Sequence, residues 1–226
     1  MLGSWWVASV LDMPNGKVVL VSWVVLVIGS IVLHELSHGW AALNRGDRTP
    51  IETGHMTWNP LVHMGQMSLI LFLVFGFAFG AMPVNPSRFR GRHAGAFVAA
   101  AGPAMNLVIA GVCILLGGIV LAFANKFGDP LAQNLFTFFR LGVMLNIVLM
   151  IFNLIPVPPL DGSRILADFS PRYAQLWYGE NARWVASGLF IIVFIFGGEY
   201  IVPLGFGAAD HGILFIANLF PQPSPA

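Results

Sequence analysis

Long, mostly apolar runs constrain this chain more than any other feature of its sequence. A helix that spans a bilayer needs about 20 consecutive apolar residues. Four runs reach that length, and they are residues Val18–Ala42, Ala94–Ala124, Asn134–Ile155 and Ala182–Leu204. Only 9% of the 226 residues are charged, against about 25% in an average soluble domain. The pattern predicts an all-α, multi-pass integral membrane protein with about four to six transmembrane helices.

Two further apolar segments are too short or too interrupted to be simple spans. Gln66–Met82 contains Gly76 and Gly80, and Pro83 would end any helix that reached it. Ile213–Phe220 is too short to cross a bilayer alone. These segments leave the number of crossings open, which matters for the topology below.

The chain shows no soluble domain and no internal repeat, so residues 1–226 are predicted to form a single transmembrane domain. Its core covers residues 18–170, and residues 171–226 add C-terminal helices and a tail. The polar stretch 45–65 is predicted to hold a short β-hairpin at the membrane surface. Cys113 is the only cysteine, so no intrachain disulfide is possible.

The motif HELSH lies at residues 34–38, at the end of the first apolar run. His34 and His38 are four residues apart, so both imidazoles lie on one face of a helix, and this spacing can bind one Zn²⁺. Glu35 lies beside them, where it can act as a general base toward a water molecule. An ionisable side chain at the centre of a spanning helix costs roughly 2.5–3.5 kcal/mol, so such residues usually serve a function. The motif therefore predicts a catalytic zinc site.

Two histidines leave a third protein ligand to be found, and Asp161 is the strongest candidate. It ends the stretch MIFNLIPVPPLDG, where three prolines force extended backbone and Gly162 permits a tight turn. Extended backbone at membrane depth is tolerated only where protein buries it or where it lines a cavity. A simple turn aspartate is the alternative for Asp161. Asp47 and Glu52 are expected at the surface, and three further carboxylates are expected in polar loops: Asp168, Glu180 and Asp210.

Together these stretches resemble the site-2 protease family of intramembrane zinc metalloproteases. HELSH, AAAGPAMNL and NLIPVPPLDG follow one another in the family's order, and GHMTWNPLVH and AMPVNPSRFR are similar to its small bacterial branch without PDZ domains. The resemblance implies that His34, His38 and Asp161 bind one zinc ion per chain and that Glu35 is catalytic. It also implies that Asn153 holds the substrate or stabilises the oxyanion.

Other residues match the family less informatively. Asn106 lies in the GPxxN part of AAAGPAMNL, but the family gives it no settled role. His55 and His63 also match the pattern, and we expect them to be interfacial or structural. Met82 stands where relatives often have lysine, and Met64–Gly65 stands where they often have Asp-Pro. Both departures lie near the expected substrate entry, so they bear on substrate preference and not on the chemistry.

The number of crossings predicts a re-entrant segment. His34 lies 17 residues after Lys17, about 25 Å along a helix, so HELSH lies near the far face of the membrane. Asp161 must reach the same face to share a metal, so an even number of crossings separates the two. Counting Gln66–Met82 as a span gives three crossings, so this segment is predicted to enter and leave by one face.

The basic residues support that count and suggest an orientation. If Gln66–Met82 is re-entrant, Lys17 and Lys126 are the only basic residues on the face opposite the site, and Arg140 lies inside a span. Eight arginines share the face of the site: Arg45, Arg48, Arg88, Arg90, Arg92, Arg164, Arg172 and Arg183. The positive-inside rule then predicts that the site faces the cytoplasm, in a bacterial inner membrane.

The sequence thus predicts a zinc metalloendopeptidase that hydrolyses a peptide bond within or next to the transmembrane segment of a single-pass membrane protein, inside the lipid bilayer. Two alternatives remain. The first is another membrane zinc hydrolase, acting on a lipid or a small amide. The second is a zinc-binding scaffold or metal transporter, against which Glu35 argues because a structural zinc site needs no base. A net charge of +1 gives no sign of a nucleic-acid partner.

Overall fold

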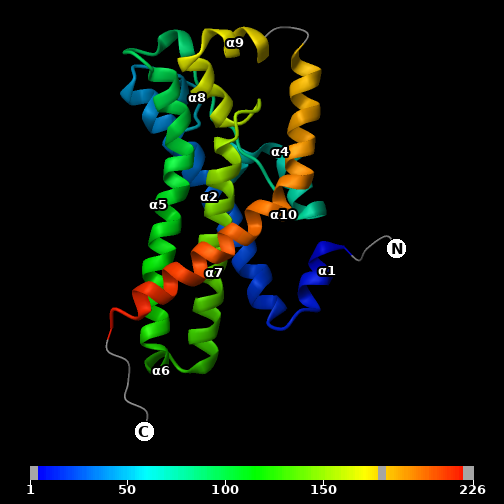
Figure 1. Ribbon diagram of the computed structural model, residues 1–226, viewed down its shortest axis with the longest axis vertical. Helices are drawn as coiled ribbons and strands as arrows, with labels where there is room; N and C mark the ends of the chain where they lie inside the picture. Colours follow the sequence, from blue (N-terminus) through cyan, green and yellow to red (C-terminus); the bar gives the residue numbers. More distant parts are fainter. Residues whose placement is uncertain (1–4, 178–181, 221–226) are drawn as a thin grey trace.

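The computed structural model describes residues 5–177 and 182–220, except for the side chain of Arg183, and Glu180 lies outside these ranges. Four helices in the described part are long and apolar enough to cross a membrane. They are α2 (Gly16–Asn44), α5 (Ala94–Ala122), α7 (Asp129–Leu154) and α10 (Ala182–Ala217). They match the four predicted runs, although α5 and α7 end two residues and one residue earlier than predicted. Helix α10 continues past Pro203 into the short apolar run predicted at Ile213–Phe220. The runs Ala182–Leu204 and Ile213–Phe220 are therefore parts of one element that changes direction (Figure 1).

The spanning helices pack through small residues and apolar clusters. Helices α5 and α7 lie side by side, α2 packs on both, and the second half of α10 crosses over both of them (Figure 1). Gly142 of α7 faces Cys113 of α5, and a Cβ at Gly142 would lie 2.7 Å from the Cys113 sulfur. Such close contacts are typical of helix packing in lipid, where no hydrophobic effect drives the helices together.

One pair of opposite charges joins two of the spanning helices. Arg140 of α7 donates from Nε and Nη2 to the two carboxylate oxygens of Asp210 in α10, the second bond at 2.8 Å. Its guanidinium also lies 4.6 Å from the centre of the Phe206 ring. The expectation that Asp210 lies in a polar loop is therefore wrong. A paired charge is the form in which ionisable residues are found within a bilayer.

Seven shorter helices complete the described part. They are α1 (Trp6–Leu11), α3 (Thr49–Glu52), α4 (Pro60–Phe75), the 3₁₀ helix η1 (Pro86–Arg88), α6 (Ala124–Phe127), α8 (Asp161–Phe169) and α9 (Pro171–Trp177). The described ranges contain no strand, so the β-hairpin predicted at 45–65 is wrong. The chain there forms α3 and turns instead. Pro50 at the start of α3 fixes a helical φ, and Pro60 begins α4 in the same way.

Residues 60–85 enter the bundle and return without crossing it. Asn59 caps α4 by accepting the Leu61 N–H at 3.0 Å. The helix ends at Gly76, whose φ of 78° is a left-handed conformation that glycine adopts at little cost. The chain then runs back along α4 in an extended form, with the Ala81 N–H donating to the His63 carbonyl at 3.0 Å. This is the re-entrant course predicted from the crossing count. Residues 60–64 precede a kink at Gly65, and the helical part after the kink begins at Gln66, as expected.

Tryptophans hold the tip of this re-entrant segment. The indole N–H groups of Trp5 and Trp6 donate to the Leu73 carbonyl at 2.9 and 3.0 Å, and that of Trp23 donates to the Gly76 carbonyl at 2.7 Å. The last carbonyls of a helix have no partner within the helix, and lipid supplies none. The N-terminal helix α1 therefore has a clear structural role, because it closes the exposed end of α4.

Asp47 anchors the other end of the re-entrant segment. We expected this carboxylate at the surface, but it is fully buried. It accepts hydrogen bonds from the N–H of Thr49 at 3.0 Å and from the N–H of Asn85 at 2.7 Å. Burial raises the pKa of Asp47, but these hydrogen bonds from Asn85 and Thr49 outweigh burial and hold the pKa below its ordinary value. An ionised Asp47 thus ties residues 47–49 to the return point of the segment.

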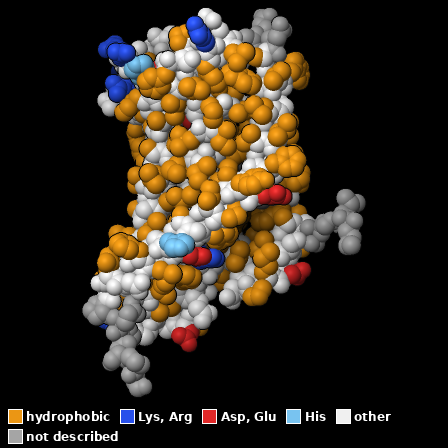
Figure 2. Space-filling view, in the orientation of Figure 1, with side chains coloured by type: hydrophobic (Ala, Val, Ile, Leu, Met, Phe, Trp, Pro, Cys, Tyr) orange, Lys and Arg blue, Asp and Glu red, His pale blue; other side chains and the backbone are white. Residues whose placement is uncertain are grey.

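The surface agrees with a membrane protein. Apolar side chains cover most of the face seen in Figure 2, and basic side chains gather at one end. That end carries α8, α9 and the start of α5 (Figure 1).

The course of α4 predicts that residues 53 and 87 lie on the same side of the membrane. In a Cys113→Ser background, single cysteines replace the exposed residues Thr53, Ser87 and Asn125. A membrane-impermeant maleimide added outside intact cells should label only position 125. Labelling at both 53 and 87 but not at 125 would reverse the orientation and keep the fold. Labelling at 87 but not at 53 would mean that residues 60–85 cross the bilayer.

Candidate metal centre

The HELSH motif lies buried in the second half of α2. His34, Glu35 and His38 are each less than 10% exposed. Helix α5 covers the two histidines with the backbone of Gly102, where a Cβ would lie 2.4 Å from both Nε2 atoms. Only glycine fits at that position, which explains a glycine in the GPxxN stretch.

The proline loop after α7 brings Asp161 to these histidines. Asp161 is the first residue of α8 and is 6% exposed. Gly162 lies so close to the last turn of α7 that a Cβ there would be 2.2 Å from the Leu154 carbonyl oxygen. The Ser163 hydroxyl donates to the Leu160 carbonyl at 2.8 Å and closes the turn. The sequence PVPPLDG therefore folds back on α7 and places the carboxylate inside the protein.

Three side-chain atoms from α2 and α8 converge. The Nε2 atoms of His34 and His38 are 3.1 Å apart, and Asp161 Oδ2 lies 3.2 and 3.3 Å from them. In tetrahedral zinc sites, bonds of 2.0–2.2 Å place neighbouring ligand atoms about 3.3–3.5 Å apart. Two imidazoles and a carboxylate with these spacings therefore fit zinc. Three protein ligands leave a fourth position open, as catalytic zinc sites do.

The two imidazoles are held in one tautomer. His34 Nδ1–H donates to Asn106 Oδ1 at 2.6 Å, and His38 Nδ1–H donates to the Val98 carbonyl at 2.8 Å. Both Nε2 lone pairs are therefore free to face the metal position. Such outer hydrogen bonds orient metal-binding histidines and raise their basicity.

A chain of buried amides continues from Asn106. Its Nδ2 donates to Asn146 Oδ1 at 2.8 Å, and Asn146 Nδ2 donates to Ser30 Oγ at 3.0 Å. Asn106 and Asn146 are both fully buried. The family resemblance left the role of Asn106 open, and Asn146 is a polar residue inside the apolar run Asn134–Ile155. An asparagine in each of two apolar runs was the available signal, because a buried amide needs a partner.

Glu35 lies at the edge of this cluster, next to the returning part of the re-entrant segment. A Cβ at Gly80 would lie 2.7 Å from Glu35 Oε1, so the extended chain passes directly over the carboxylate. Glu35 is not one of the three converging ligands. The position agrees with a general base.

Asn153 is half-buried in the last turn of α7, and its Nδ2 donates to the Leu149 carbonyl at 3.0 Å. Within the described ranges, no hydrogen bond joins it to His34, His38 or Asp161. Its expected role in binding substrate or oxyanion stays a prediction.

The remaining expected carboxylates and histidines have other partners. Glu52 pairs with Arg88 at 2.6 Å. Asp168 lies in α8 and not in the expected polar loop, and it accepts from His93 at 3.1 Å. His63 is 2% exposed and donates to the Thr57 carbonyl at 2.7 Å. The His55 ring lies 6.4 Å from that of His63. The contacts of His55 and His63 lie within the polar stretch 45–65, and none of these residues joins the three converging ligands.

Comparisons with known proteins agree with this geometry. The sequence model of peptidase family M50 matches residues 114–196, which include the loop that carries Asp161. The chain is 34% identical over 205 residues to "Putative zinc metalloprotease YwhC" of Bacillus subtilis. The match covers 88% of this chain and 92% of that protein.

Two longer relatives are more distant. "Putative zinc metalloprotease Rip2" of Mycolicibacterium smegmatis is 31% identical over 171 residues, and the match covers 73% of this chain and 62% of Rip2. "Zinc metalloprotease MJ0392" of Methanocaldococcus jannaschii is 28% identical over 188 residues, and the match covers 83% of this chain and 46% of that protein. No solved structure matches the chain significantly.

The geometry predicts a graded loss of zinc. Asp161→Ala, His34→Ala and His38→Ala should each abolish stoichiometric zinc in the purified chain, because each removes a ligand. Asn106→Leu should weaken zinc binding by about 10–100-fold, because it removes the acceptor that orients His34. Asp168→Ala is the matched control, and its zinc affinity, measured by chelator competition, should equal that of the wild type. Full zinc in Asp161→Ala would exclude Asp161 as a ligand.

Proposed function

The chain belongs to peptidase family M50, the site-2 protease family of zinc metalloproteases, and we propose that it hydrolyses a peptide bond within or next to a transmembrane segment of another membrane protein. The observation that carries this proposal is the depth of the site. HELSH lies within a spanning helix and is buried by α5, α8 and the re-entrant segment. A substrate must therefore reach the site through the membrane-embedded part of the protein.

Zinc would be held by His34, His38 and Asp161. A zinc ion bound there supplies Lewis acidity and lowers the pKa of a water molecule to about 7. Glu35 accepts a proton from the attacking water and returns it to the leaving amine, as a general base and then a general acid. Asn106 and Val98 keep the two imidazoles in position throughout.

The returning part of the re-entrant segment is suited to hold an unwound substrate. A helical substrate satisfies all its carbonyls internally, so it must become extended before attack. Phe79 and Ala81 direct main-chain N–H groups toward α4. The N–H groups of Ala78, Gly80 and Met82 alternate with them and bind no partner among the described residues. An extended peptide could pair with this free edge by β-augmentation, directly above Glu35.

We place the protein in a bacterial inner membrane with its site toward the cytoplasm. The support is the end where basic side chains gather (Figure 2), because the loops before α5 and after α8 lie there (Figure 1). The positive-inside rule favours the cytoplasmic side for such loops. The proposed partners are a single-pass membrane-protein substrate and the surrounding lipid.

Glu35→Gln tests the proposal. This variant should retain one zinc per chain and lose all cleavage, because the amide cannot accept a proton. In cells that lack the wild-type gene, a full-length single-pass membrane protein should accumulate with Glu35→Gln and be cleaved when the wild type is restored. That protein, purified with the wild-type chain in detergent, should be cleaved directly. Cleavage by Glu35→Gln would refute the mechanism, and a change only in lipids or small amides would favour the rival hydrolase.

Asn153→Ala separates two roles for that residue. If Asn153 donates to the oxyanion, its removal should lower kcat on the order of 10²–10³-fold with zinc retained. A rise in KM with kcat unchanged would assign it to substrate holding. An unchanged kcat/KM would show that the family's asparagine has neither role here.

A further inference from the structure

The first half of α10 stands at the edge of the bundle, and α10 is the least buried of the four spanning helices (Figure 1). One side of this half contacts the rest of the protein. Ala186 and Ile201 are only 5% and 7% exposed. The ring centre of Phe194 lies 4.8 Å from that of Phe77 and 5.9 Å from that of Phe152.

A stripe of exposed residues runs along the opposite side. Its members are spaced three or four residues apart, so they share one face of the helix. Three of them are more than half exposed, and a Cβ at Gly188 would meet nothing within 4 Å. We call these five residues the outer stripe: Trp184, Gly188, Ile192, Ile195 and Glu199.

Glu199 distinguishes this stripe from an ordinary lipid-facing surface. The residue is exposed, and no ion pair or hydrogen bond joins it to another described residue. Asp210, the acidic residue further along the same helix, is paired with Arg140. A carboxylate that faces lipid is costly, and acidic residues in spanning helices almost always have a partner.

The position of Glu199 along α10 places it within the apolar part of the membrane. It follows Trp184 by 15 residues, or about 22 Å of helix, and tryptophans are enriched at membrane interfaces. The hydrocarbon core is about 30 Å thick. The helix also continues for 18 residues beyond Glu199, to Ala217, so Glu199 lies at neither end of it.

We propose that the outer stripe binds a transmembrane helix of another membrane protein, and that Glu199 pairs with a lysine or arginine inside that helix. An ionised carboxylate accepts hydrogen bonds only, so a basic side chain at the same depth is its complement. Ile192 and Ile195 supply apolar contact area. Gly188 lets the partner backbone approach closely, as small residues do in membrane helix interfaces.

A second copy of the chain does not meet this requirement. Copies in one membrane share one orientation, so a symmetric dimer through the stripe has its twofold axis along the membrane normal. It would bring Glu199 next to Glu199 at the same depth, where like charges repel. Arg140 of a second copy is already paired with Asp210.

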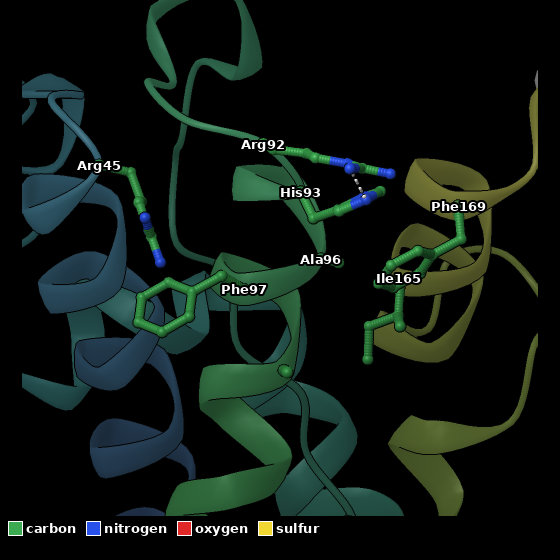
Figure 3. A pocket seen from close by; sticks show the side chains of 8 residues that line it. Arg45, Arg92, His93, Ala96, Phe97, Ile165 and Phe169 are labelled. Carbon is green, nitrogen blue, oxygen red and sulfur yellow. Dashed lines mark hydrogen bonds between the residues drawn. The ribbon is translucent and has the colours of Figure 1, made fainter.

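Two arginines at the basic end of the molecule are likewise engaged and at the wrong depth. The guanidinium of Arg45 lies over the Phe97 ring, and Arg92 donates to His93 (Figure 3). Arg45 follows the end of α2, and Arg92 precedes the start of α5. The basic residue that faces Glu199 must therefore come from a different protein.

The bound helix is a companion subunit and not a substrate. The outer stripe lies on the side of α10 that faces away from Phe152 and Phe77. Phe152 directly precedes Asn153, and Phe77 begins the returning part of the re-entrant segment. The body of α10 thus separates the stripe from the metal centre. This inference does not depend on the proposed peptidase activity.

A model helix tests the charge requirement without any need for cleavage. The purified full-length chain is reconstituted in phosphatidylcholine vesicles with a fluorescent synthetic helix of about 20 leucine and alanine residues. One version carries a single central lysine, and the matched version carries leucine there. Energy transfer should show about tenfold tighter association of the lysine helix, the usual scale of one polar contact between helices in a bilayer. Equal association of the two helices would overturn the proposal.

Matched variants assign that preference to the stripe. Glu199→Leu should abolish the preference for the lysine helix, and Glu199→Lys should instead favour a helix with a central aspartate. Asp12→Asn removes an exposed carboxylate outside the spanning helices and should keep the wild-type preference. An unchanged size-exclusion profile verifies that each variant is folded. A lysine preference that persists in Glu199→Leu would overturn the proposal.

Photo-crosslinking in cells tests for the natural partner. A crosslinking residue at position 195 should give a polypeptide adduct that is absent from position 112, where Val112 is an exposed residue of α5. The captured protein should have a lysine or arginine within an apolar span, and leucine at that position should abolish the adduct. It should also remain uncleaved in cells with the wild-type chain. A lipid adduct alone, a second copy, a partner without the basic residue, or a protein that is cleaved unless Glu35→Gln is present would each overturn the proposal.

Discussion

The hydrocarbon interior of a bilayer donates and accepts no hydrogen bonds, and this constraint explains most of the internal polar contacts of the protein. At the tip of the re-entrant segment, Trp5, Trp6 and Trp23 donate to carbonyls that lipid would leave without a partner. Arg140 of α7 is paired in the same way with Asp210 of α10. In both cases the partner comes from another element.

The metal centre follows the same rule with a chemical purpose. His34 and His38 use one nitrogen each for a fixed acceptor, so the other nitrogen faces Asp161. The amides of Asn106 and Asn146 extend this support from α2 across α5 to α7. Removal of one amide would leave buried polar atoms unpaired, which costs more than the bond itself contributes. The hydrogen bonds therefore fix the side chains that face the metal position, while Gly80 of the extended chain covers Glu35.

The sequence by itself determined the spanning helices, the pairing of His34 with His38 on one face, the candidacy of Asp161 and the non-crossing of Gln66–Met82. These depend on apolar length, helical periodicity, proline geometry and crossing parity, all of which are local or countable. The tertiary structure alone decided that Asp47 is buried, that residues 45–65 form no hairpin, that Gly102 must lack a side chain, and that Asn106 supports His34. The last contact joins residues 72 apart, and the Trp6 contact joins residues 67 apart. A local pattern cannot encode such partners, because only packing of the helices brings their side chains within hydrogen-bond distance.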